Sequence, residues 1–196
     1  MISKFFDTTG GGKNLTSISR FFLSLIKGYN HEKYWSRRAK VVDPQTKIPM
    51  IIKLYYLLYI KRKDAKLHCS FGTGLNYGAQ FATPPFLPHG PYGIIVGTDV
   101  KVGSGCIIYH QVTIAGGNVE IGDRVELGAG AKVLPNVKIG SYCHVGANAV
   151  VVEDMPDNST CVLQKPRIII KDNENKNLNI NLIWNSLGYF VGWVLI

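Results

Sequence analysis

The chain has 196 residues, of which 46% are hydrophobic, enough for one domain with a full core and short appendages. Its formal net charge is +9, from 22 Lys and Arg against 13 Asp and Glu, which fits either a solvated basic surface or an anionic partner. No basic run is interleaved with aromatic residues in a nucleic-acid-binding motif, so we expect no nucleic-acid partner.

Residues 1–70 are predicted to form an N-terminal helical segment. Residues 1–14 are polar and Gly-rich without a signal-peptide core, and no apolar run reaches the roughly 20 residues that span a bilayer. We therefore expect a cytoplasmic protein. Residues 21–26 form a short apolar patch that predicts a helix, and residues 31–67 are also predicted to be helical.

The strongest helix of this segment is predicted to begin at Pro49 and to end at Lys61, Arg62 and Lys63, because proline suits a first turn and cations suit a last turn. It is apolar on most sides. We expect it to be buried against the repeat region that follows or against a neighbouring subunit. Contact with a membrane surface is the less favoured alternative.

Residues 71–170 are predicted to form a β-helix domain, which makes the fold class mainly β. A helix repeats every 3.6 residues and a strand every two, whereas this chain has an apolar residue at every sixth position. A three-sided parallel β-helix explains this period, because each unit makes one strand and one corner. One single-residue slip interrupts the series, at Gly116, Gly117 and Asn118. The series is Val96, Val102, Ile108, Ile114, Ile121, Leu127, Val133, Ile139, Val145 and Val151.

Both ends of this domain are less regular. Phe71, Tyr77 and Thr83 keep the six-residue step and predict a first coil, which the prolines of residues 84–91 distort. Such distortion beside a regular scaffold is a typical place for a site. Residues 153–158 predict an exit from the coils, followed by one more extended segment over 160–170. Residues 171–196 are predicted to be a linker and an apolar tail, which needs a partner surface.

The four cysteines form no CxxC pair, and Cys106 and Cys143 fall at the fifth position of their units. We interpret those two as small core residues, which is consistent with a reducing cytoplasm.

Two histidines are candidate site residues. His110 is the third residue of its unit, and His89 is the third residue of the unit that begins at Leu87. One full coil separates them, so we expect both at one corner, roughly 5 Å apart along the axis. Two imidazoles there suggest a general base and a neighbour that binds or orients a substrate; two solvated corner residues are the alternative. His144 is predicted to lie on the surface.

Several segments resemble the serine acetyltransferase-like branch of the hexapeptide-repeat acyltransferases. Residues 87–97 resemble its His-x-x-Gly-Ile-Val-x segment with one extra residue, and residues 112–117 resemble its Val-Thr-Ile/Leu-Gly-Gly. Residues 121–131 and 145–151 are also similar to the family, and the resemblance extends over residues 71–170. It implies a left-handed β-helix and a homotrimer that binds acetyl-CoA between subunits.

The resemblance also implies roles for particular residues. His89 matches the general base, which removes a proton from an acceptor hydroxyl as that oxygen attacks the thioester. His110 is then a candidate for binding the acceptor. Ala129 and Ala147 match positions that line the pantetheine path. Lys165 and Arg167 fall near the position where basic side chains meet the CoA 3′-phosphate.

No metal is expected. Zinc-binding β-helix proteins of the carbonic anhydrase kind typically carry two histidines five residues apart, and this chain has no such pair.

Departures from the family pattern bear on the acceptor. Pro88 stands where serine acetyltransferases have an Asp before the histidine, and Gly74 is nearest to the Asp that orients it. The loop over residues 116–120 is short and lacks the Arg-His pair that holds serine. We therefore predict an O-acetyltransferase that acts on a sugar hydroxyl, probably the wrong choice only if free serine is the acceptor.

The predicted acceptor is a sugar of a capsular or other surface polysaccharide, because the shorter pattern is more similar to the sugar and polysaccharide O-acetyltransferases. Three alternatives stay open. They are serine O-acetylation for cysteine biosynthesis, acetylation of an antibiotic or other xenobiotic, and a non-catalytic β-helix scaffold.

Overall fold

The computed structural model describes residues 29–165 and residue 169. The chain divides into two compact units, Met1–Leu163 and Gln164–Ile196, and the first contains every described helix and strand. The predicted helix over residues 21–26 and the predicted linker and tail over residues 171–196 lie outside the described residues.

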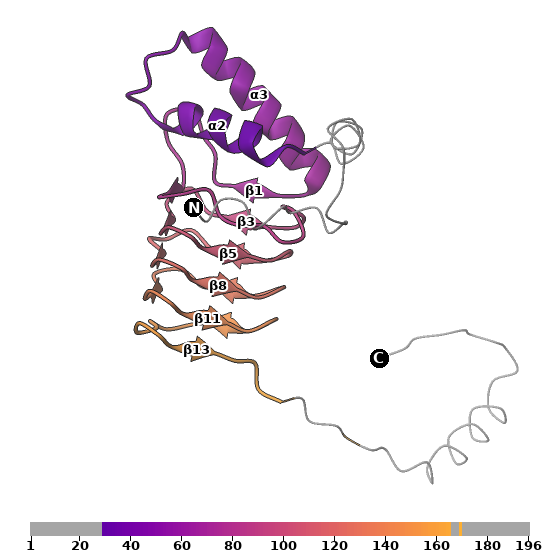
Figure 1. The fold of residues 1–196 in the computed structure, drawn as a ribbon, viewed down its shortest axis with the longest axis vertical. Coiled ribbons are helices and arrows are strands. Elements are labelled where there is room, and N and C mark those ends of the chain that lie inside the picture. Colours follow the sequence, from indigo (N-terminus) through magenta and orange to yellow (C-terminus); the bar gives the residue numbers. More distant parts are fainter. Residues whose placement is uncertain (1–28, 166–168, 170–196) are drawn as a thin grey trace, which may run out of the picture. The chain divides into compact units, whose positions relative to one another are not determined.

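Two helices precede a series of two-residue strands (Figure 1). The helices are α2 (His31–Val42) and α3 (Met50–Leu67). The strands are β1 (Ser70–Phe71), β2 (Gln80–Phe81), β3 (Ile95–Val96), β4 (Lys101–Val102), β5 (Ile107–Ile108), β6 (Thr113–Ile114), β7 (Glu120–Ile121), β8 (Glu126–Leu127), β9 (Lys132–Val133), β10 (Lys138–Ile139), β11 (His144–Val145), β12 (Val150–Val151) and β13 (Thr160–Cys161).

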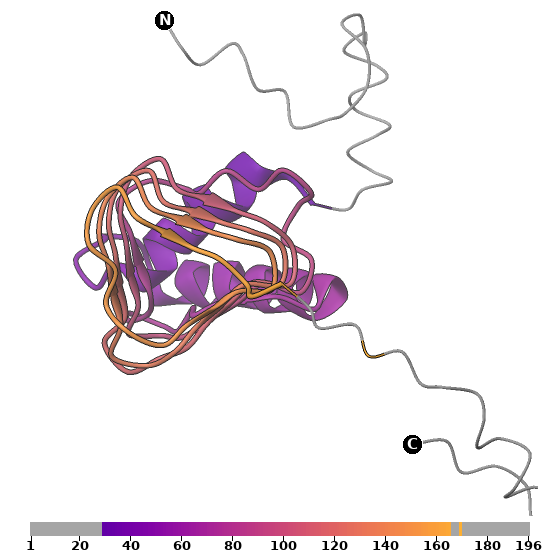
Figure 2. The same cartoon turned by 90° about the horizontal axis from the view of Figure 1, so that it is seen from below.

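The strands form three parallel sheets, ordered β1-β3-β6-β9-β12, β10-β7-β4-β2 and β13-β11-β8-β5. Successive strands of the chain go to different sheets, so each coil contributes one strand to every sheet. Val96 pairs with Ile114, and Ile114 pairs with Val133, one coil further along. Seen from below, the coils lie over one another around a three-sided core (Figure 2). The predicted β-helix is confirmed.

Two residues of each regular unit point into this core. The series at every sixth position is buried from Val96 to Val151, and so are the residues two positions before each strand's second residue, including Cys106 and Cys143. These two cysteines are thus core residues, as predicted. Removing this apolar surface from water is the main stabilising contribution, at about 25 cal/mol per Å².

The slip in the repeat is an extra residue at one corner. Asn118 and Gly117 have left-handed φ values of 61° and 91°. The Asp99 carboxylate, one coil earlier, accepts hydrogen bonds from the Gly117 N–H at 2.6 Å and the Asn118 N–H at 3.1 Å. These bonds lower the pKa of Asp99. The carboxylate therefore satisfies the backbone that the inserted residue turns away from the ladder.

The predicted six-residue step of the first coil is wrong. Phe71 lies in β1, but the next equivalent position is Phe81 in β2, because Phe81 pairs with Val102. A short antiparallel bridge between Thr73 and Gly78 accounts for the extra residues. It leaves Tyr77 63% exposed rather than in the core.

The last coil also extends further than the predicted exit. Met155 forms a parallel bridge with Ile139, and Thr160 and Cys161 pair with His144 and Val145. The turn-rich residues after Val152 therefore belong to a shortened final coil.

Helix α2 covers the open end of the first coil. Trp35 packs against Phe71 and Phe81, with ring centroids 5.1 Å and 4.9 Å apart. Arg38, only 3% exposed, donates to the carbonyl oxygens of Phe71 and Ala79 at 2.7 Å and 2.6 Å. No earlier coil exists to pair with these carbonyls, so the guanidinium takes the place of a neighbouring strand.

Helix α3 does not bury most of its apolar surface in this chain. Its buried stripe consists of Lys53, Ile60, Asp64 and Leu67, whereas Ile51 is 77% exposed. The stripe includes two charged residues because each has partners: Lys53 donates to Asp43 O, and Asp64 accepts from the Tyr34 hydroxyl at 2.6 Å. The predicted burial against the repeat region is thus wrong for the outer side of α3. Neither described helix is long and apolar enough to cross a membrane.

Candidate active site

The two candidate histidines lie in one column at one corner of the β-helix. The register places His89, His110, Ala129 and Ala147 at equivalent positions in successive coils, each just after a strand position of the β5-β8-β11 sheet. The His89 and His110 ring centroids are 5.4 Å apart, with planes at 77°. Four of the six predicted site residues are therefore aligned along the axis.

Left-handed residues after the strands make this corner. Gln111, Gly130 and Asn148 have φ values of 60°, 72° and 56°. The Gly130 N–H donates to His110 O at 3.0 Å, and the Asn148 N–H donates to Ala129 O at 2.8 Å. These bonds between coils fix the backbone beside each column member, so the side chains are held by the scaffold rather than by a flexible loop.

His89 stands on the distorted first part of the corner. A turn closes behind it, because the Gly90 N–H donates to Leu87 O at 3.1 Å. Gly90 takes a φ of 76°, which a side chain would strain. The His89 ring is exposed as a result, and it lies 5.8 Å from the Tyr109 ring.

A shallow depression of about 490 Å³ runs along this corner. Its floor contains Gly128 and Gly146 beside the alanines of the column. A Cβ at Gly128 would lie 2.8 Å from both the Ala147 nitrogen and Val145 O, closer than packing allows. The floor is therefore narrow backbone without large side chains. The lining residues are His89, Tyr109, His110, Glu126, Gly128, Ala129, His144, Val145, Gly146, Ala147 and Thr160.

The wall of the depression carries polar groups that the sequence argument did not assign to the site. Glu126 and His144 are paired in adjacent coils, with His144 Nδ1 3.2 Å from Glu126 Oε2. Desolvation raises the pKa of the Tyr109 hydroxyl, and the neighbouring Glu126 carboxylate raises it further. His144 is exposed, as predicted, yet it lines the same depression. Its spacing of 18 residues from Glu126, the length of one coil, was the signal that could have joined them.

The histidines have few polar partners in the described part of the chain. No described carboxylate hydrogen-bonds to His89, whose ring neighbours are Tyr109 and His110. His110 Nδ1 is buried and has no hydrogen-bond partner among the described residues. Such a nitrogen costs about 1–3 kcal/mol if it stays unpaired, so a polar group of a bound molecule would be stabilised there.

The two predicted cations are not brought to this depression. Lys165 is exposed and belongs to the second unit, and Arg167 lies outside the described residues. Across residues 29–165, no three His, Cys, Asp or Glu side chains are grouped so that they could hold a metal ion.

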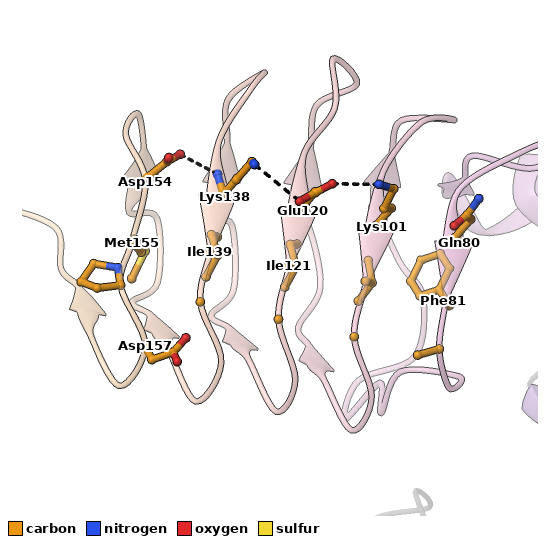
Figure 3. Close-up of a pocket in the computed structure, with 16 residues that line it drawn as sticks. Gln80, Phe81, Lys101, Glu120, Ile121, Lys138, Ile139, Asp154, Met155 and Asp157 are labelled. Carbon is orange, nitrogen blue, oxygen red and sulfur yellow. Dashed lines mark hydrogen bonds and ion pairs between the residues drawn. The ribbon is translucent and has the colours of Figure 1, made fainter.

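A second, larger depression lies on the β10-β7-β4-β2 sheet and contains none of the predicted site residues (Figure 3). Its charged side chains neutralise one another in a ladder. Lys101 Nζ is 2.8 Å from Glu120 Oε1, and Lys138 Nζ is 3.8 Å from Glu120 Oε2. The hydrogen bond from Lys101 lowers the pKa of Glu120. This face offers no titrating base, so the histidine corner is the better candidate for chemistry.

Comparisons with known proteins identify the class of this repeat. Residues 118–152 match the family described as "Bacterial transferase hexapeptide (six repeats)". Serine acetyltransferase of Mycobacterium tuberculosis is 39% identical over 70 residues, 32% of this chain and 30% of that protein. Serine acetyltransferase of Helicobacter pylori is 38% identical over 70 residues, 32% of this chain and 40% of that protein. The chain thus aligns with about a third of the length of these curated relatives.

A solved structure extends the similarity to most of the described chain. The soybean serine acetyltransferase apoenzyme is 26% identical, with a TM-score of 0.56, over 79% of this chain and 62% of that chain. The β-helix therefore carries the hexapeptide repeat of bacterial transferases, and its relatives include serine acetyltransferases.

Proposed function

We propose that the chain is an acetyl-CoA-dependent O-acetyltransferase with His89 as the general base. The observation that carries this proposal is the exposed His89 ring, stacked one coil above His110 at the head of a floor of small residues. An acceptor hydroxyl has a pKa far above neutral, and an imidazole with a pKa near 6.5 can take its proton at cellular pH.

The reaction needs no Ser or Cys nucleophile in the protein. As the acceptor oxygen attacks the thioester carbonyl, its proton passes to His89, and a carbon–oxygen bond forms. The carbon–sulfur bond then breaks, and the leaving sulfur takes up a proton to give free CoA thiol. His110, whose Nδ1 is buried and unpaired, is proposed to hold the acceptor.

Acetyl-CoA fits the floor of the depression. Ala129 and Ala147 present only methyl groups, and Gly128 and Gly146 present none, so an extended pantetheine arm could approach the backbone closely. Backbone groups there can pair with the amides of the arm. Lys165 and Arg167 are proposed to meet the 3′-phosphate, and a homotrimer with sites between subunits is part of the proposal.

The named relatives support L-serine as the acceptor better than the predicted polysaccharide, since those reported above are serine acetyltransferases. L-serine is therefore the first acceptor to test.

One observation favours a sugar hydroxyl as a second candidate. No Lys or Arg is among the residues that line the depression, and Glu126 adds a carboxylate. The loop after Ile114 is closed by the Asp99 carboxylate and also supplies no cation. The carboxylate of a free amino acid would have no opposite charge here, whereas a neutral sugar needs none.

The test is acetyl-CoA turnover by the full chain, followed as free thiol, with L-serine, hexoses and oligosaccharides as acceptors. Release that requires serine supports serine acetylation and removes the sugar candidate. Release that requires a sugar supports the second candidate. If no acceptor, including hydroxyl-bearing antibiotics, raises thiol release above the rate without acceptor, the enzyme proposal fails and a scaffold is favoured.

A further inference from the structure

The outer face of α3 is an unpartnered surface of unusual composition. We define it as the exposed residues opposite the buried stripe: Ile51, Leu54, Tyr55, Leu58, Lys61, Arg62 and Lys66. At 100° per residue these positions share one side of the helix. Ile51 is 77% and Leu58 68% exposed, which is high for large aliphatic side chains on a folded domain.

The face changes character along its length. Its first half is apolar, and its second half carries Lys61, Arg62 and Lys66 without an acid. Asp64 is the only acid in α3, and it points the other way, buried against Tyr34. The outer face is thus apolar and cationic together, with no anion of its own.

The helical layer concentrates the charge of the whole chain. Residues 29–68 contain ten Lys and Arg against three Asp and Glu, a net charge of +7 out of +9. This surplus lies in the layer that bears the exposed apolar side chains.

Tyrosines and cations alternate at the edge of the face. The Arg37 guanidinium lies 4.2 Å from the Tyr59 ring centroid and 5.6 Å from that of Tyr55. Tyrosine and arginine are both side chains with an apolar body and a polar end, which suits a boundary between water and hydrocarbon.

We infer that the outer face of α3 docks on the surface of an anionic lipid bilayer, with the helix lying in the plane of the interface. The apolar half would enter the acyl boundary, and the cationic half would pair with headgroups. A second copy of this face is a poorer partner, because it would bring like charges together with no acid to pair them. The inference does not depend on the proposed function.

The test is sedimentation of the full chain with vesicles of equimolar phosphatidylglycerol and phosphatidylcholine, and with phosphatidylcholine alone. We expect binding to the anionic vesicles that weakens with added salt. Lys61→Gln with Arg62→Gln should weaken it by about tenfold or more, because each cation near an anionic surface contributes separately. Leu54→Glu with Leu58→Glu should abolish it.

The matched control is Lys138→Gln with Arg124→Gln, which removes the same charge from the β-helix and should bind like wild type. Circular dichroism checks that each variant is folded. Wild type that fails to bind anionic vesicles overturns the inference, as does binding retained by the Leu54 and Leu58 variant or lost equally in the control. Self-association that the same leucine substitutions abolish, without vesicle binding, would assign the face to a second copy.

Discussion

Replacing Arg38 with Met should destabilise the domain by removing the group that closes the first coil. Methionine fills similar space but cannot donate to Phe71 O or Ala79 O, nor to the Thr73 hydroxyl oxygen at 3.0 Å. Two buried carbonyls without partners cost about 1–3 kcal/mol each. Part of this is offset, because burial disfavours the charged guanidinium and lowers the pKa of Arg38 to about 10.

We therefore expect Arg38→Met to lower the free energy of unfolding by about 2–4 kcal/mol. For a domain of this size, each kcal/mol shifts Tm by about 2–4 °C, so Tm should fall by about 4–16 °C. Differential scanning calorimetry measures this, with the exposed Lys47→Met as the control for losing a cation. An Arg38→Met variant as stable as Lys47→Met would refute the view that this side chain replaces a neighbouring strand.

Three other changes test separate parts of the account. Gly128→Ala should unfold at lower denaturant concentration than Gly146→Ala, because the new Cβ would lie 2.8 Å from the Ala147 nitrogen but 3.3 Å from its nearest neighbour at Gly146; equal midpoints would contradict this. Burial raises the pKa of Asp64, so its carboxylate favours folding less as pH rises through that pKa. Asp64→Asn should thus gain stability relative to wild type between about pH 4 and 7 in urea titrations, and a constant difference would count against it. Glu126→Gln should raise the ratio of serine to sugar turnover by about fivefold, since it removes a like charge worth on the order of 1 kcal/mol; an unchanged ratio would show that Glu126 does not repel the acceptor.

The repeat was predictable because six-residue spacing leaves one geometric solution over many coils. Val96 to Val151 could be placed in the core from the sequence alone, and the slip at Asn118 could be located. The first coil could not, because Tyr77 keeps the spacing by chance while Phe81 fills the position beside Val102. A local insertion changes register without changing composition.

Part of the site was also predictable, since counting one coil from His89 leads to His110 and then to Ala129 and Ala147. The wall was missed because Glu126 and His144 are outward residues of ordinary strands, and only their register brings them to the corner. The burial of α3 was misjudged because its composition does not reveal that Lys53 and Asp64 would find partners and take the inner side.

The measurement that tests the central claim most directly is the rate of acetyl-CoA-dependent thiol release by His89→Ala, with the acceptor that gives the highest wild-type rate. We expect the variant to remain folded and its turnover to fall by roughly 10²–10⁴, the usual contribution of a general base. His68→Asn, at the exposed C-cap of α3 and outside the depression, should retain the wild-type rate. Turnover of His89→Ala close to that of wild type would contradict the account.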